Sequence, residues 1–61
     1  MTKRELYYTR KITEFKERAE ASRKAYRRLR RNNPTAAWLA SERAEYLTRQ
    51  VQRYTQKLKA A

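Results

Sequence analysis

The stretch RRNNPTAAW, residues 30–38, interrupts an otherwise continuous helical pattern and divides the 61-residue chain almost in half. Asparagine tolerates the left-handed backbone conformation that often ends a helix, and the residue before a proline is disfavoured in the helical region. Pro34 suits the first turn of a new helix, with Asn33 or Thr35 as its N-cap. The sequence therefore predicts a first helix over about 3–31, a turn at 32–34 and a second helix over about 35–59.

Apolar residues recur at alternating spacings of four and three on both sides of this turn, which is the pattern of a coiled-coil face. In the first half they are Tyr8, Ile12, Phe15, Ala19, Ser22, Tyr26 and Leu29. In the second half they are Ala37, Ala40, Ala44, Leu47, Val51, Tyr54, Leu58 and Ala61. Folding the chain back at the turn pairs Ala19 with Leu47 and Ile12 with Tyr54. The predicted fold is an all-α antiparallel two-helix hairpin, a single domain over 1–61.

The chain is expected to be ordered. Low hydrophobicity with a high net charge also occurs in disordered proteins. The absence of glycine, the single proline and the unbroken periodicity favour a folded hairpin instead. Thr2 and Glu5 add the spacing of a capping box at the start of the first helix.

The predicted helix–helix seam is thin, because five of its positions are alanine and one is serine. A two-helix unit of this kind usually needs a staple, a metal or a partner, and the chain contains no cysteine. We therefore expect a homodimer that forms a four-helix bundle, in preference to a monomeric hairpin. Residues off the seam supply the additional contact, and the predicted interface consists of Trp38, Leu39 and Tyr46.

The charge of the chain is strongly one-sided, with 17 Lys and Arg against 6 acidic residues and a net charge of +11. Such an excess costs self-repulsion in the compact state and indicates a polyanionic partner. Nucleic acid is the commonest polyanion, and acidic proteins and acidic membrane surfaces are the alternatives. A membrane is the weakest of the three, because alanine-rich faces suit helix packing better than burial among acyl chains.

Several residue types are missing altogether, namely Cys, His, Asp and Gly. Thiol chemistry and a glycine-rich phosphate loop are thereby excluded. No base, nucleophile and oxyanion donor form a recognisable set, so we expect no enzyme, no metal and no cofactor. No run approaches the roughly 20 apolar residues of a membrane span, and a secretory segment is not apparent. A cytoplasmic location is expected, with nucleoid or ribosome association as further alternatives.

The densest cluster of charge lies just before the turn, where six basic residues surround the seam residues Tyr26 and Leu29. Cations at a helix C-terminus complement the helix dipole by about 0.3–1 kcal/mol each, which accounts for two or three of the six. The facing half of the second helix carries only Glu42 and Glu45 as acidic residues. We predict that this basic run contacts nucleic-acid phosphates; its members are Arg23, Lys24, Arg27, Arg28, Arg30 and Arg31.

A second basic cluster lies at the other end of the first helix. It consists of Lys3, Arg4, Arg10 and Lys11, and the fold-back is expected to bring Arg49, Arg53, Lys57 and Lys59 beside it. Cations at a helix N-terminus are unfavourable for the helix dipole, so local helix energetics do not explain Lys3 and Arg4. The alternative is an ordinary surface with ion pairs such as Glu14–Arg18 and Glu20–Lys24.

The predicted function is binding of DNA or RNA through phosphate charge. Little sequence specificity is expected, because no helix presents a pattern of polar base-reading side chains. The alternative is a protein-interaction module, such as an adaptor, scaffold or inhibitor, that docks on an acidic partner protein.

Two families share this layout. With MTKRE at residues 1–5, the chain is similar to the small plasmid RNA-binding repressors that form antiparallel four-helix bundles, although those proteins are far less basic. With RQVQRYTQKLK at residues 49–59, it is similar in size, charge and layout to a small helical-hairpin protein of the large ribosomal subunit. Neither resemblance is carried over to individual residues.

Overall fold

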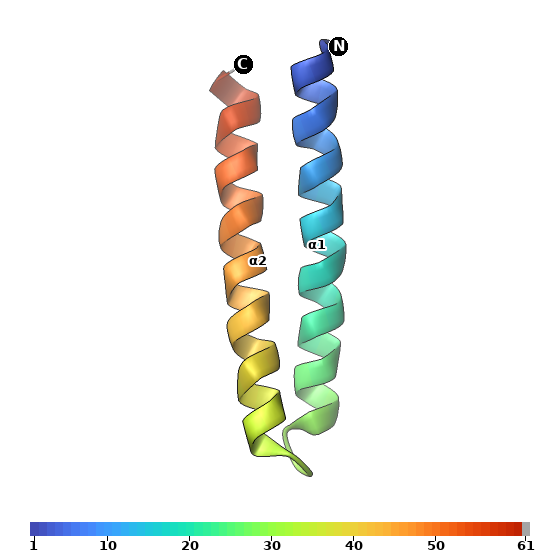
Figure 1. Ribbon diagram of the computed structural model, residues 1–61, viewed down its shortest axis with the longest axis vertical. Coiled ribbons are helices and arrows are strands. Elements are labelled where there is room, and N and C mark those ends of the chain that lie inside the picture. The colour runs from blue at the N-terminus through green and yellow to red at the C-terminus, as the bar shows by residue number, and fades with distance from the viewer. Residues whose placement is uncertain (61) are drawn as a thin grey trace.

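The computed structural model of the protein describes residues 1–60, so the predicted seam residue Ala61 lies outside the described residues. These residues form two helices of 27 residues each, α1 (Lys3–Leu29) and α2 (Pro34–Ala60). The helices run antiparallel side by side, with both termini at one end and the turn at the other (Figure 1). The resulting rod measures 46 × 13 × 10 Å. The predicted all-α hairpin is confirmed.

The start of α1 is fixed by the capping box that the sequence predicts. The Thr2 hydroxyl accepts a hydrogen bond from the Glu5 backbone N–H at 3.1 Å. The Glu5 carboxylate in turn accepts from the Thr2 backbone N–H at 3.2 Å. Both bonds satisfy backbone donors that the first helical turn leaves without partners.

The turn differs from the prediction in two details. Helix α1 ends at Leu29 rather than near residue 31, and the cap residue Arg30 stays right-handed at φ −59° and ψ −27°. No residue among 1–60 has a positive φ, so α1 does not end in the left-handed conformation that asparagine tolerates. The reason is that the backbone continues its right-handed winding, and the Asn33 N–H reaches the Leu29 carbonyl at 2.7 Å.

Helix α2 begins at Pro34, one residue earlier than predicted. The side-chain oxygen of Asn33 accepts a hydrogen bond from the Ala36 N–H at 3.2 Å. Of the two N-caps that the sequence allows, Asn33 is therefore the one used. Proline fits the first helical position because its missing N–H would have no helical partner there.

The core follows the predicted seam. The five buried residues are Ala19, Ser22, Ala37, Ala44 and Leu47, and each occupies a seam position. Nearer the termini, aromatic rings fill the seam: Tyr54 stacks on Phe15 at 5.6 Å between centroids and lies 5.9 Å from Tyr8. Tyr8 and Phe15 come about one helical turn before and one turn after Ile12, the residue predicted to face Tyr54. The half of the hairpin near the turn is packed by small residues and the half near the termini by aromatic ones.

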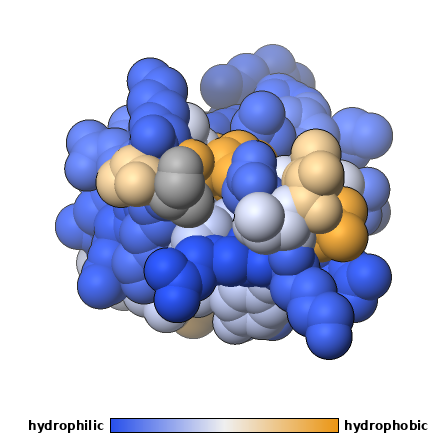
Figure 2. Space-filling model, turned by 90° about the horizontal axis from the view of Figure 1, so that it is seen from above, coloured by the Kyte–Doolittle hydropathy of each residue, from blue (hydrophilic) through white to orange (hydrophobic). Residues whose placement is uncertain are grey.

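This core is thin, and no large side chain is fully buried among residues 1–60. Hydrophilic side chains cover most of the end that carries the termini (Figure 2). Several large apolar residues remain exposed, notably Leu6, Tyr7, Trp38, Leu39 and Tyr46. Neither of the described helices is long and apolar enough to cross a membrane.

Candidate nucleic-acid interface

The basic run before the turn divides into two groups, of which the first surrounds Glu20. One carboxylate oxygen of Glu20 lies 3.5 Å from Arg23, and the other lies 3.6 Å from Arg27. The Arg23 guanidinium also donates a hydrogen bond to the Thr48 hydroxyl of α2 at 2.9 Å. Glu20 therefore pairs with Arg23 and Arg27 and not with Lys24, the partner suggested by the sequence.

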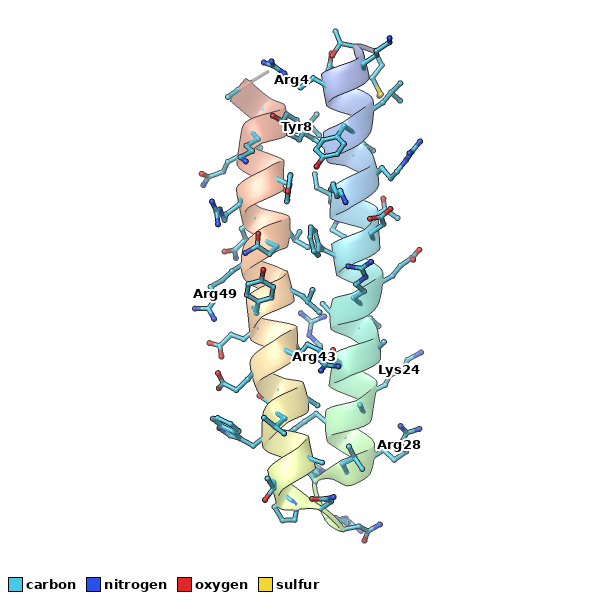
Figure 3. The ribbon with its side chains drawn as sticks, viewed as in Figure 1. Arg4, Tyr8, Lys24, Arg28, Arg43 and Arg49 are labelled. Atoms are coloured by element: carbon cyan, nitrogen blue, oxygen red, sulfur yellow. The ribbon has the colours of Figure 1, made fainter. Side chains whose placement is uncertain are left out.

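The second group is exposed and unpaired. Lys24 and Arg28 point away from α2 (Figure 3), and Arg30 and Arg31 follow in the turn. None of these four side chains forms an ion pair with another residue of the described chain. In the first group, the single carboxylate of Glu20 is shared by Arg23 and Arg27 and neutralises little of their charge. Exposed ion pairs of this kind contribute only about 0–1 kcal/mol. The run therefore presents concentrated positive charge to the solvent.

Beside this run the surface is hollowed. A depression of about 290 Å³, here called the turn depression, is lined by Tyr26, Arg30, Pro34, Ala37, Trp38 and Ser41. A larger groove of about 600 Å³, here called the central groove, is lined by Arg23, Tyr26, Ser41, Ala44, Glu45, Thr48, Arg49 and Gln52. The two share Tyr26 and Ser41, so they are neighbouring parts of one uneven surface on this side of the hairpin. Arginine side chains line both parts of it.

The second basic cluster is less concentrated than the first. Lys11 already has partners within α1. Its Nζ lies 3.7 Å from the Glu14 carboxylate and 5.6 Å from the centroid of the Tyr7 ring. Glu14 thus pairs with Lys11 and not with Arg18. Arg4 lies near Tyr8 at the terminal end (Figure 3) and lines a small depression of about 240 Å³ together with Lys57. Lys3 and Arg10 are exposed.

One member expected beside this second cluster is elsewhere. Arg49 points outward from the middle of α2 (Figure 3) and lines the central groove with Arg23. The reason is its place in the sequence, since residue 49 lies near the midpoint of Pro34–Ala60 and far from the termini. Arg49 thus lines the central groove, beside the first basic run.

The predicted interface residues Trp38, Leu39 and Tyr46 are all exposed, but they do not form one patch. Trp38 lines the turn depression. Tyr46 lines a separate depression of about 450 Å³, whose other lining residues are Arg18, Ala21, Ser22, Arg43 and Leu47. Leu39 precedes Tyr46 by seven residues, which is about two helical turns, so both lie on the same side of α2. Trp38 is adjacent to Leu39 in the helix and therefore points about 100° away from it.

Sequence reasoning missed two features of this surface. The first is Tyr26, a seam residue whose side chain is 38% exposed. A signal for this was present, because the second helix offers only small residues opposite it, namely Ala37, Ala40 and Ser41. The second is the pair Arg18 and Arg43, which come from different helices and line the same depression as Tyr46.

No protein-family model, curated protein or solved structure matches this chain. A surface of exposed arginines, interrupted by hydroxyl and aromatic side chains, is suited to hold phosphates and to contact flat rings.

Proposed function

We propose that the protein is a small, non-enzymatic nucleic-acid-binding protein that acts in the cytoplasm. It contacts the phosphate backbone of DNA or RNA and reads little sequence. The first contact is the basic run of six residues in α1 and the turn, and the cluster of Lys3, Arg4, Arg10 and Lys11 is the second.

The observation that carries this proposal is the exposed group Lys24, Arg28, Arg30 and Arg31. These four cations are close in sequence, and no carboxylate of the described residues neutralises them. Like charges this close repel each other in the free protein. A phosphate backbone relieves the repulsion and releases condensed counterions, which favours binding.

Binding to a mixed-sequence duplex over a range of salt concentrations tests the proposal. The logarithm of the affinity should fall linearly with the logarithm of the salt concentration, by about 0.9 for each phosphate neutralised. Several unrelated duplex sequences should give similar slopes. Absence of binding at low salt would contradict the proposed function.

We further propose that two hairpins associate into a four-helix bundle. Support comes from the thin core and from the exposed side chains of Leu39 and Tyr46, which are 57% and 54% accessible. Burial of a leucine or an aromatic side chain contributes about 1.5–3 kcal/mol, a gain that the isolated hairpin leaves unused. Sedimentation equilibrium tests this, and the expected result is a dimer whose dissociation increases when Leu39 and Tyr46 are replaced by Ser.

A second candidate function is docking on an acidic partner protein. The observation that favours it is the depression in which Tyr46 lies beside Arg18 and Arg43, an apolar surface flanked by cations. Arginine and tyrosine are common at the centres of protein interfaces. Replacement of Arg18 and Arg43 by Gln should abolish capture of an acidic protein while leaving nucleic-acid binding intact.

A further inference from the structure

Tyr26 is unusual among the large seam residues because it is exposed. It comes from α1 and its side chain is 38% exposed. Of the α2 residues that line the turn depression with it, Ala37 and Ser41 are small. A larger residue at either position would close over the ring. The alanine-rich start of α2 therefore leaves an aromatic surface open to the solvent.

Trp38 lines the same depression from α2, and its side chain is 60% exposed. The ring–ring contacts of residues 1–60 all involve the aromatic cluster near the termini, so Tyr26 and Trp38 do not stack on each other. The depression has a volume of about 290 Å³. Ligand sites begin at about 300 Å³, so this one suits a single flat group better than a large ligand.

The charge around the depression is positive. Arg30 lines it and forms no ion pair within the described chain, and no carboxylate lines it. Arg23 lines the central groove, which adjoins the depression at Tyr26 and Ser41. Glu45 is the one acidic residue along that groove. A flat aromatic surface next to a free guanidinium matches the two parts of a nucleotide, the base and the phosphate.

We propose that the turn depression binds one unpaired nucleobase of a single-stranded nucleic acid. The base stacks on Trp38 and Tyr26, and Arg30 contacts a neighbouring phosphate. This inference rests on the proposed function and adds a preference for single strands to it. In a duplex the faces of the bases are covered by their stacked neighbours, so no base can stack on Trp38 and Tyr26 unless it is flipped out.

Trp38 provides a direct test because it is the only tryptophan in the chain. The protein, at one fixed concentration, is titrated with an oligothymidylate and with a duplex that has the same number of phosphates, at the same salt concentration. Stacking of a base on the indole should quench the Trp38 emission with the oligothymidylate. The duplex should bind without comparable quenching.

Substitutions separate stacking from charge, with affinities measured by the anisotropy of labelled probes. Trp38→Leu should weaken oligothymidylate binding by at least about fivefold, the lower end of base–aromatic stacking, and leave duplex binding unchanged. Trp38→Phe keeps a ring and should retain most of the affinity. Tyr46→Leu is the matched control, because Tyr46 is similarly exposed but lines a different depression. At concentrations where the protein is monomeric, Tyr46→Leu should leave both affinities unchanged, although Tyr46 belongs to the proposed dimer interface.

The outcomes distinguish this inference from the function on which it rests. Duplex binding with a normal salt dependence, combined with an unaltered single-strand affinity of Trp38→Leu, would overturn the stacking site alone. Absence of binding to both probes would overturn the proposed function as well. An emission that responds to protein concentration but not to the oligothymidylate would assign Trp38 to a protein contact and also overturn the inference.

Discussion

The guanidinium of Arg23 in α1 donates a hydrogen bond to the hydroxyl of Thr48 in α2 at 2.9 Å. Thr48 also donates to the Ala44 carbonyl at 2.9 Å, and Arg23 lies 3.5 Å from Glu20. The bond from Arg23 to Thr48 is the one side-chain hydrogen bond that joins the two helices within residues 1–60. One member of the basic run thus fastens the hairpin together, whereas four others carry no such role.

Thr48→Val should lower the free energy of unfolding by about 0.5–1.5 kcal/mol, because it removes the acceptor for Arg23 while preserving side-chain volume. Thr55→Val is the matched control, since Thr55 also donates to the carbonyl four residues earlier, at 2.7 Å, but has no partner on α1. Thermal unfolding followed by circular dichroism measures both. Equal destabilisation by the two substitutions would show that the contact between the helices contributes nothing.

The seam prediction is tested by two leucines of the same helix. Leu47 is 6% exposed and Leu39 is 57% exposed. Leu47→Ala should lower the free energy of unfolding by about 2–4 kcal/mol through lost burial and a residual cavity. Leu39→Ala should change it by less than about 0.5 kcal/mol at concentrations where the protein is monomeric. A larger effect of Leu39→Ala that grows with protein concentration would place Leu39 in the assembly interface.

The start of α2 gives a prediction about capping. Asn33→Ala should destabilise the hairpin by about 1 kcal/mol, because it removes the acceptor for the Ala36 N–H. Thr35→Ala should have little effect, since the structure gives Thr35 no capping bond. The reverse order of the two melting temperatures would assign the N-cap to Thr35.

The heptad pattern was sufficient to predict the fold and the buried side of each helix, and the sequence Asn32-Asn33-Pro34 was sufficient to predict the approximate position of the turn. Each buried residue was among the predicted seam positions, because periodicity alone determines which side of a helix faces its neighbour. The conformation of the turn was not predictable in the same way. Asparagine permits a left-handed helix end without requiring one, and the backbone bond from Asn33 to Leu29 decided the outcome.

The candidate site was predicted only in outline. The sequence indicates that positive charge gathers around residues 23–31, but ion pairs depend on side-chain placement across the hairpin. Spacing within α1 allows Glu20 to pair with Arg23 or with Lys24, and it does not contain the hydrogen bond from Arg23 to Thr48 of α2. The separation of Trp38 from Tyr46 into two depressions likewise follows from how α2 packs against α1.

The proposed phosphate contact lies at the end of α1 and in the turn, and the salt dependence of duplex binding reports on it. The variant carries Lys24→Gln, Arg28→Gln, Arg30→Gln and Arg31→Gln, which remove the four cations without an ion pair. The control loses the same charge elsewhere through Lys16→Gln, Arg43→Gln, Arg53→Gln and Lys59→Gln, all at exposed positions.

The two proteins have the same net charge, so any difference between them reports the location of the cations. We expect the slope of log affinity against log salt to become shallower by about 3 for the variant and to change much less for the control. Both should keep the helical content of the parent. Equal slopes for the two proteins would contradict a phosphate contact at this end of the hairpin and leave only a general effect of net charge.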